Sequence, residues 1–145
     1  MPIPKSILSR PGALLVIAAR TGQERANARL AAMGLNVRMC GVLNLLADEG
    51  PLSQHQIGEM LGIDRTTMVE LLDDLEKQGT LRREVNPQDR RSHLIKLTPE
   101  GKARQKVAMK AFDDAAAEFF SPLTAPERQQ MAAMLKRLIT KPDNP

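Results

Sequence analysis

Two segments of this sequence carry arginines where they could bind a polyanion. Arg90 and Arg91 lie within residues 86–92, a turn-forming segment with no apolar neighbour on which the two side chains could pack. Such arginines can enter a DNA minor groove or contact phosphates. Arg65 and Thr66 begin a predicted helix, where side chains and the helix dipole can meet base edges or phosphates. These residue types therefore indicate recognition of a nucleic acid.

The arginine-bearing helix is the second of two short predicted helices. Ser53 and Gln56 form a capping box at the start of the first helix. Gly62 ends that helix, and Asp64 is the expected N-cap of the next. Because only Ile63 and Asp64 separate the two, they must cross sharply. A short, glycine-containing turn between two helices is typical of a helix-turn-helix motif.

A hairpin is predicted after the second helix, which ends at Gly79. Residues 81–85 and 93–97 alternate loosely between apolar and polar side chains, as in short strands, and the polar segment 86–92 is expected to be a loop. Leu52 is expected to pair with this hairpin as a minimal third strand.

Residues 89–101, DRRSHLIKLTPEG, resemble the wing signature of the MarR family of winged-helix transcription regulators. The upstream segment 61–79, LGIDRTTMVELLDDLEKQG, is similar to the recognition helix of that family. The residues that carry the resemblance are Asp89, Arg91, Leu97, Thr98 and Gly101 in the wing, and Leu75, Glu76 and Gly79 at the end of the helix. The resemblance covers about fifty residues. It implies a mainly α fold with a small β-hairpin wing, flanked by N- and C-terminal dimerisation helices.

The flanking sequence fits one domain spanning residues 1–145. Residues 11–34 and 99–140 are expected to be dimerisation helices, and residues 35–98 a winged helix-turn-helix lobe. Asn36, Thr98 and Thr124 are predicted N-caps, the last within a capping box. Residues 1–10 are expected to be extended or disordered, and residues 141–145 to be a frayed tail. An enlarged monomeric core is the alternative use of the outer helices.

The long helix after the wing is expected to end at Pro122. A buried stripe is predicted along it, made of Ala103, Val107, Ala111, Ala115, Phe119 and Phe120.

The predicted roles of the DNA-binding residues follow from their positions. Arg91 is expected to enter the minor groove while Asp89 orients its guanidinium, and Arg90 to contact phosphate. An exposed Asp–Arg pair that contributes only about 0–1 kcal/mol is the alternative. The full predicted DNA-binding set is Arg38, Ser53, Gln54, Arg65, Thr66, Thr67, Glu70, Asp89, Arg90 and Arg91.

Charge and composition restrict the class of protein. The net charge is +4, and residues 82–110 hold nine Lys or Arg and three Asp or Glu, a local net charge of +6. The single cysteine, the lack of a long apolar run and the lack of a signal-peptide pattern predict a cytoplasmic protein. No phosphate-binding loop, metal-ligand spacing or nucleophile–base motif is found, so neither a cofactor, a metal site nor an enzyme is predicted.

The roles of three residues, Cys40, Arg20 and Arg38, have more than one interpretation. Cys40 lies on an apolar stripe, which favours a buried structural thiol over a redox sensor. Arg20 and Arg38 could pair with the carboxylate of a small aromatic or phenolic ligand, as the family resemblance implies. The sequence thus predicts a homodimeric DNA-binding transcriptional regulator, with repression as the default mode of action. A winged-helix module that binds proteins and not DNA is the alternative.

Overall fold

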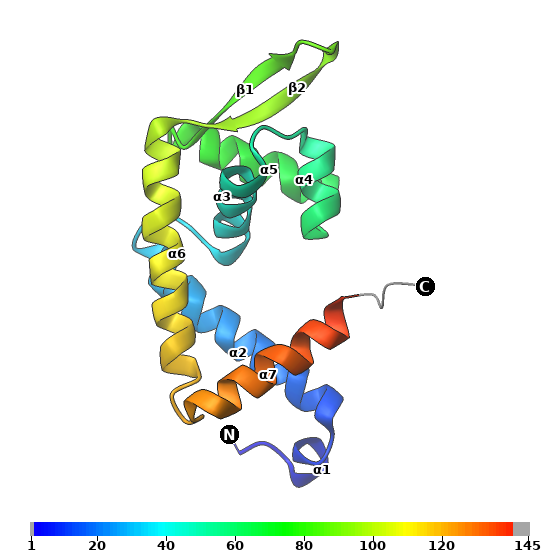
Figure 1. Ribbon diagram of the computed structural model, residues 1–145, viewed down its shortest axis with the longest axis vertical. Coiled ribbons are helices and arrows are strands. Elements are labelled where there is room, and N and C mark those ends of the chain that lie inside the picture. Colours follow the sequence, from blue (N-terminus) through cyan, green and yellow to red (C-terminus); the bar gives the residue numbers. More distant parts are fainter. Residues whose placement is uncertain (1, 141–145) are drawn as a thin grey trace.

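The computed structural model describes residues 2–140, which form helices and one two-stranded antiparallel hairpin. The elements are α1 (Lys5–Leu8), α2 (Pro11–Ala31), α3 (Val37–Glu49), α4 (Gln54–Leu61), α5 (Arg65–Lys77), β1 (Leu81–Asn86), β2 (Asp89–Leu97), α6 (Pro99–Phe119) and α7 (Ala125–Ile139). Helices α3 to α5 and the hairpin form one lobe (Figure 1). Helices α1, α2 and α7 lie at the other end, and α6 runs along both. The predicted fold class, mainly α with a β-hairpin wing, is confirmed.

The apolar core lies within the lobe of α3 to α5. Leu30 of α2 and Ala108 of α6 are also fully buried in this core, so both long helices are anchored to the lobe. The largest buried side chains of the lobe itself are those of Leu43, Ile57, Met68, Leu72, Leu75, Leu81 and Ile95. Burial of a leucine-sized side chain contributes about 1.5–3 kcal/mol, so this lobe holds most of the packing energy.

Local capping determines where the helices of the lobe begin. The side chains of Asn36 and Asp64 each accept a hydrogen bond from a backbone N–H in the first turn of their helix. Ser53 and Gln56 form the full capping box. Gly62 has a φ of 65°, a left-handed conformation that a residue without Cβ adopts at little cost. The predicted helix-turn-helix is confirmed.

The hairpin is joined to the rest of the lobe at its base. The amides and carbonyls of Leu52 and Ile95 exchange hydrogen bonds of 3.2 and 2.7 Å, which confirms Leu52 as a minimal third strand. A Cβ added to Gly101 would lie 1.8 Å from the carbonyl oxygen of Thr80. Glycine at this position therefore allows the start of α6 to pack directly on the chain that enters β1.

The N-terminal and hairpin predictions need correction. Residues 1–10 were expected to be extended or disordered, but α1 forms a helical turn within them. Residues 86–92 were expected to be a loop, but only residues 87 and 88 form the turn. The strands extend to Asn86 and from Asp89, with a register shift next to Asn86. Arg90 and Arg91 therefore lie on β2, because strand pairing continues almost to the tip of the hairpin.

The predicted apolar stripe of α6 is partly wrong. Ala103 and Val107 are exposed, Val107 by 58%. The buried positions are Gly101, Ala108 and Ala115, which are seven residues, or two turns, apart. The close contact between Gly101 and Thr80 sets which face of α6 is buried. The spacing of apolar residues within α6 does not reveal this contact, so it predicted a different face.

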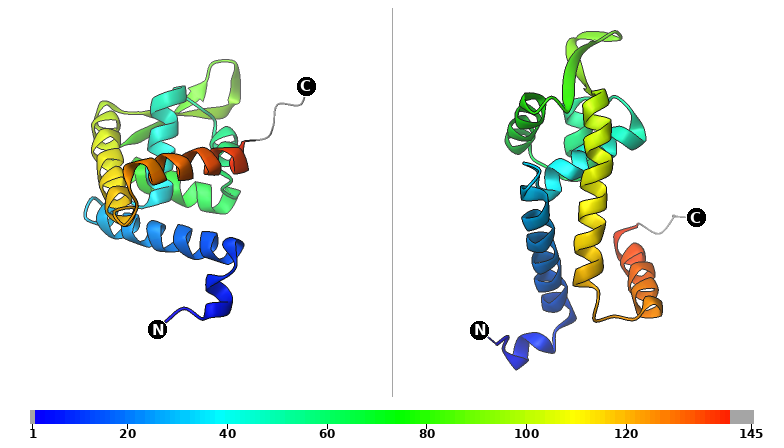
Figure 2. Two further views of the ribbon diagram at one scale, coloured as in Figure 1. Left: turned by 60° about the horizontal axis from the view of Figure 1, so that its bottom comes forward. Right: turned by 90° about the vertical axis from the view of Figure 1, so that its left-hand side faces the viewer.

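The C-terminal region differs in three details. Helix α6 ends at Phe119, before Pro122. Thr124 caps α7, but its hydroxyl donates to the Glu127 carboxylate at 2.9 Å, where the capping box expected the backbone N–H of Thr124 as donor. Helices α2 and α7 lie on different sides of α6 (Figure 2, right), and α7 contains no buried residue. The frayed tail predicted for residues 141–145 lies outside the described residues.

Candidate nucleic-acid interface

The N-terminus of α4 brings Ser53 and Gln54 to the surface of the lobe. The hydroxyl of Ser53 accepts from the N–H of Gln56 at 3.2 Å, and the Ser53 N–H donates to the Gln56 side chain at 2.9 Å. The hydroxyl oxygen of Ser53 thus accepts the capping hydrogen bond of α4, and the hydroxyl can still donate one hydrogen bond to another group. Gln54 is half-buried at the first position of α4.

The first turn of α5 presents the side chains predicted to read DNA bases. Arg65, Thr66 and Glu70 are exposed. Thr67 is not: its N–H and hydroxyl donate to the Asp64 carboxylate at 2.9 and 2.7 Å. These two bonds, the backbone one first, lower the pKa of Asp64, and the charge of Arg38 adds a smaller effect. Thr67 therefore stabilises the start of α5, and its predicted direct contact with DNA stays a prediction.

The wing presents its arginines from β2. The side chains of Arg90 and Arg91 are exposed. Asp89 accepts a hydrogen bond from the backbone N–H of Arg91 at 3.1 Å. Asp89 was predicted to orient the guanidinium of Arg91, but the bond it makes is to the backbone. Asp89 thus shapes the tip of the hairpin, because its short side chain reaches the amide two residues on.

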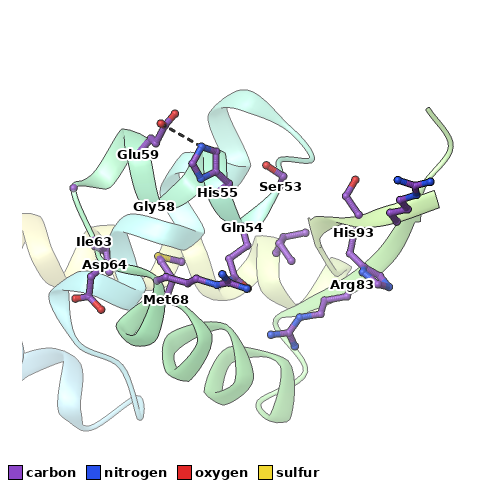
Figure 3. Close-up of a pocket in the computed structure, with 15 residues that line it drawn as sticks. Ser53, Gln54, His55, Gly58, Glu59, Ile63, Asp64, Met68, Arg83 and His93 are labelled. Atoms are coloured by element: carbon purple, nitrogen blue, oxygen red, sulfur yellow. Dashed lines mark ion pairs between the residues drawn. The ribbon is translucent and has the colours of Figure 1, made fainter. Parts of the chain in front are cut away.

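The helix-turn-helix and the wing enclose one hollow, which we call the arginine hollow. Its volume is about 860 Å³, and its lining includes Gln54, Arg65, Arg83, Arg91 and His93. Figure 3 shows residues of α4, the start of α5 and β2 around this space. Ser53 also lines it. Four predicted residues therefore meet here: Ser53, Gln54, Arg65 and Arg91.

Arg83 links the wing to α5, and sequence reasoning missed it. Its guanidinium donates to Asp73 and Glu76 of α5, each at 2.8 Å. Burial acts to lower the pKa of Arg83, but the hydrogen bonds and charges of Asp73 and Glu76 outweigh it and raise that pKa. The sequence offers only part of the signal: Asp73 and Glu76, three residues apart on α5, share a face, but it does not show that Arg83 reaches them. Arg83 holds β1 against α5 at one edge of the hollow.

Comparison with known proteins identifies the family. A model described as MarR family matches residues 33–92, which span the helix-turn-helix and most of the wing. The uncharacterized HTH-type transcriptional regulator YkoM of Bacillus subtilis (strain 168) is 33% identical over 104 residues, covering 72% of this chain and 68% of YkoM. The chain belongs to the MarR family.

Two further relatives of this MarR-family chain are informative. A candidate transcriptional regulatory protein for the hcr operon of Thauera aromatica is 31% identical over 108 residues, which cover 72% of this chain. The match spans 63% of that relative's length. The crystal structure of CouR from Rhodococcus jostii RHA1 bound to p-coumaroyl-CoA has a TM-score of 0.79 and 28% identity, covering 94% of this chain and 98% of CouR. The winged-helix architecture is thus shared along almost the whole MarR-family chain.

The remaining predicted residues lie outside the arginine hollow. Arg38 is exposed on α3 and is near enough to Asp64 to affect its pKa, after the larger effects of Thr67. Arg20 is exposed on α2 and does not line this hollow. The residues lining it also do not include Thr66, Glu70, Asp89 or Arg90.

The cysteine of this MarR-family chain is buried, as the sequence predicted, and both histidines lie at the surface. Cys40 is buried, and its sulfur lies 3.5 Å from that of Met109. Burial, with a further effect of Asp113, raises the pKa of the Cys40 thiol. A thiol held protonated is a poor redox sensor. His55 is exposed and pairs with Glu59 at 3.2 Å (Figure 3), and His93 is exposed.

Other kinds of site were sought in the same residues. Within residues 2–140, no three His, Cys, Asp or Glu side chains are grouped so that they could hold a metal ion. Among the helices of that part of the chain, none is both long and apolar enough to cross a membrane.

Proposed function

We propose that this MarR-family chain is a sequence-specific regulator that binds double-stranded DNA and represses transcription. One observation carries this proposal: Arg65 of α5 and Arg91 of β2, which form no ion pair within the described residues, line one open hollow, while Arg83 holds β1 against α5 at its edge. A shared cationic surface that spans a helix N-terminus and a wing suits a duplex, which presents phosphates on both sides of each groove. The chain is proposed to have no enzymatic activity and no cofactor.

Each element has a proposed role on DNA. Helix α5 enters the major groove, where Arg65, Thr66 and Glu70 face base edges. Arg91 enters the adjacent minor groove, and Arg90 contacts the flanking phosphates. Ser53, Gln54 and Arg38 lie at the N-termini of α4 and α3, where backbone phosphates are well placed to bind. Thr67 and Asp89 act indirectly, by shaping α5 and the hairpin tip.

A homodimer is proposed because apolar side chains at the far end of the molecule are uncovered. In α7, Leu138 is 72% exposed and Ile139 is 79% exposed, and in α2, Val16 is 67% exposed. Residues 11–34 and 99–140 would form the interface, and residues 35–98 the DNA-binding lobe. Two recognition helices then bind half-sites about 34–36 Å apart on a pseudo-palindromic operator.

Regulation by a small ligand is part of the proposal. The similar structure of CouR holds p-coumaroyl-CoA. We infer that a small aromatic or phenolic ligand binds this chain between the dimerisation helices and the lobe, where Arg20 and Arg38 would pair with a carboxylate. Such a ligand releases DNA only if it binds the free and the DNA-bound lobe spacings with different affinity. A regulator of this kind acts in the cytoplasm.

Selection from random-sequence DNA at two salt concentrations tests the proposal. We expect the purified dimer to enrich a pseudo-palindromic site. If six to ten phosphates are neutralised, affinity for that site falls roughly 10³- to 10⁵-fold between 50 and 200 mM salt. Ligand carried through purification is removed first by unfolding and refolding the chain. Failure of the refolded dimer to enrich any site would favour the alternative, a winged-helix module that binds proteins.

A further inference from the structure

The basic segment that follows the wing contains lysines that the DNA interface does not use. Of the basic residues between positions 82 and 110, Arg104 donates to the Met33 carbonyl and Lys110 pairs with Asp114. Lys96, Lys102 and Lys106 make no side-chain hydrogen bond or ion pair with any other described residue (2–140). Three cations of one segment are therefore left without a partner.

The three lysines line one hollow, which we call the lysine hollow. Its volume is about 360 Å³, and it lies between the C-terminal end of α3, the end of β2 and the first turns of α6. Leu46 and Leu97, both buried, contribute apolar lining. No Asp or Glu is among the residues that line this hollow. A space of this size is at the lower end of the range for small-molecule sites, about 300–1,000 Å³.

The lysine hollow is separate from the proposed DNA surface. The lysine hollow and the arginine hollow have no lining residue in common. Lys96 lies next to Ile95, which lines the arginine hollow, and successive side chains of a strand point to opposite faces. Lys96 therefore faces away from α4 and from the first turn of α5.

We propose that the lysine hollow binds a small organic anion that carries at least two negative charges beside an apolar group. Three ammonium groups that line one hollow with no carboxylate in its lining repel one another, and an anion between them removes that repulsion. The apolar lining favours an organic over an inorganic anion. Gln105 is fixed at the rim by its bond to Asn44 at 3.0 Å. The site is distinct from the one proposed near Arg20 and Arg38.

Phenyl phosphate is a suitable probe, because it joins a dianion to an apolar ring. Calorimetric titration of the full-length protein at constant ionic strength is expected to show one site per chain. Lys106→Gln should weaken phenyl phosphate binding about tenfold, since it removes one charge-assisted hydrogen bond. Lys110→Gln is the matched control: it removes the same charge one turn along the same helix, outside the hollow. It should leave the affinity within about twofold.

A second variant and a second probe make the test independent of any one lysine. Ala47→Glu places a carboxylate in the hollow from an exposed helical position and should abolish binding. Inorganic phosphate should bind at least tenfold more weakly than phenyl phosphate. Equal binding of the two probes would overturn the organic-ligand assignment. Equal effects of Lys106→Gln and Lys110→Gln, or no binding of phenyl phosphate, would overturn the site.

Binding to operator DNA separates this inference from the proposed function. Lys106→Gln and Lys110→Gln should change operator affinity by a similar factor, because each removes one positive charge from α6 outside the proposed DNA surface, and the Lys110–Asp114 pair lost in the second variant is exposed. If Lys106→Gln alone weakens operator binding, the hollow meets DNA backbone and the small-anion proposal is wrong. The titration with phenyl phosphate tests the lysine hollow whether or not the protein binds an operator.

Discussion

Among single residues, the arginines of the wing differ in what surrounds them. Arg91 lines the arginine hollow, whereas Arg82 pairs with Glu84 at 2.9 Å and does not line the hollow. Arg91→Ala is therefore expected to weaken operator binding by about 1–3 kcal/mol, which is roughly 5- to 150-fold. Fluorescence anisotropy with a labelled operator at fixed salt measures this change.

Arg82→Ala is the matched control for Arg91→Ala, because it removes the same charge from the same hairpin. We expect a smaller effect, in line with loss of general electrostatic attraction. Sedimentation must show that both variants keep the oligomeric state of the wild type. Equal losses for Arg82→Ala and Arg91→Ala would show that the wing contributes only charge and that Arg91 makes no specific contact.

Asp64 predicts a pH dependence of stability. Its pKa is lowered in the folded protein, first by the Thr67 N–H and then by the Thr67 hydroxyl. A lowered folded pKa stabilises the protein above the ordinary aspartate value of about 3.9. That stability is lost as the pH falls below this value and through the folded pKa. Asp64→Asn keeps a capping oxygen without the charge.

Urea denaturation of wild type and Asp64→Asn at pH 7 and pH 3 tests this linkage. At pH 7 the wild type should have the larger free energy of unfolding, and at pH 3 the difference should shrink. A difference that is the same at both pH values would mean that the carboxylate charge of Asp64 does not stabilise the N-terminus of α5.

Between elements, Arg83 is the contact that fixes the wing on α5. Arg83→Met keeps much of the aliphatic stem but removes the pairs with Asp73 and Glu76. Because both acids are partly exposed, we expect a loss of stability of only about 1 kcal/mol. Operator affinity should fall further than that, since the wing and α5 must be held at one relative angle to bind adjacent grooves. Hydrogen exchange of the β1 amides should increase.

A double-mutant cycle provides the control for Arg83. Asp73→Ala and Arg83→Met together should cost less than the sum of the two single variants, in both stability and operator affinity. Additive effects would show that Arg83 acts on DNA directly and not by positioning the wing.

Elements specified by neighbouring residues could be predicted from the sequence, and those specified by tertiary contacts could not. The caps at Asn36, Ser53 and Asp64 depend on hydrogen bonds within one helical turn, so the residue types alone are sufficient to predict them. The inward face of α6 depends on Thr80 packing against Gly101 from another element. The same holds at the site: Arg65 was recognisable from its place in α5, whereas the role of Arg83 depends on two carboxylates seven and ten residues away.

For the whole molecule, α7 presents the strongest reason to expect a partner subunit. It is a helix of 15 residues with no buried side chain. Isolated helices of about 12–15 residues are marginal in water, and most helical stability in proteins comes from packing an apolar face. Leu138→Glu combined with Ile139→Glu is therefore expected to convert the dimer to a monomer in sedimentation at micromolar concentration. Each buried leucine-sized side chain would otherwise contribute about 1.5–3 kcal/mol.

Val85→Glu is a control for the same apolar-to-acidic change, because Val85 is also exposed but lies in β1, outside the proposed interface of residues 11–34 and 99–140. It should leave the dimer intact. The monomeric variant should retain the circular dichroism of the lobe, since the core of α3 to α5 is buried within one chain. Its operator affinity should nevertheless fall strongly. A monomer carries one α5 and binds one half-site, so the gain in affinity from binding both half-sites at once is lost. A Leu138→Glu, Ile139→Glu variant that stays dimeric would place the interface elsewhere, and α7 would then have to be covered by a different surface.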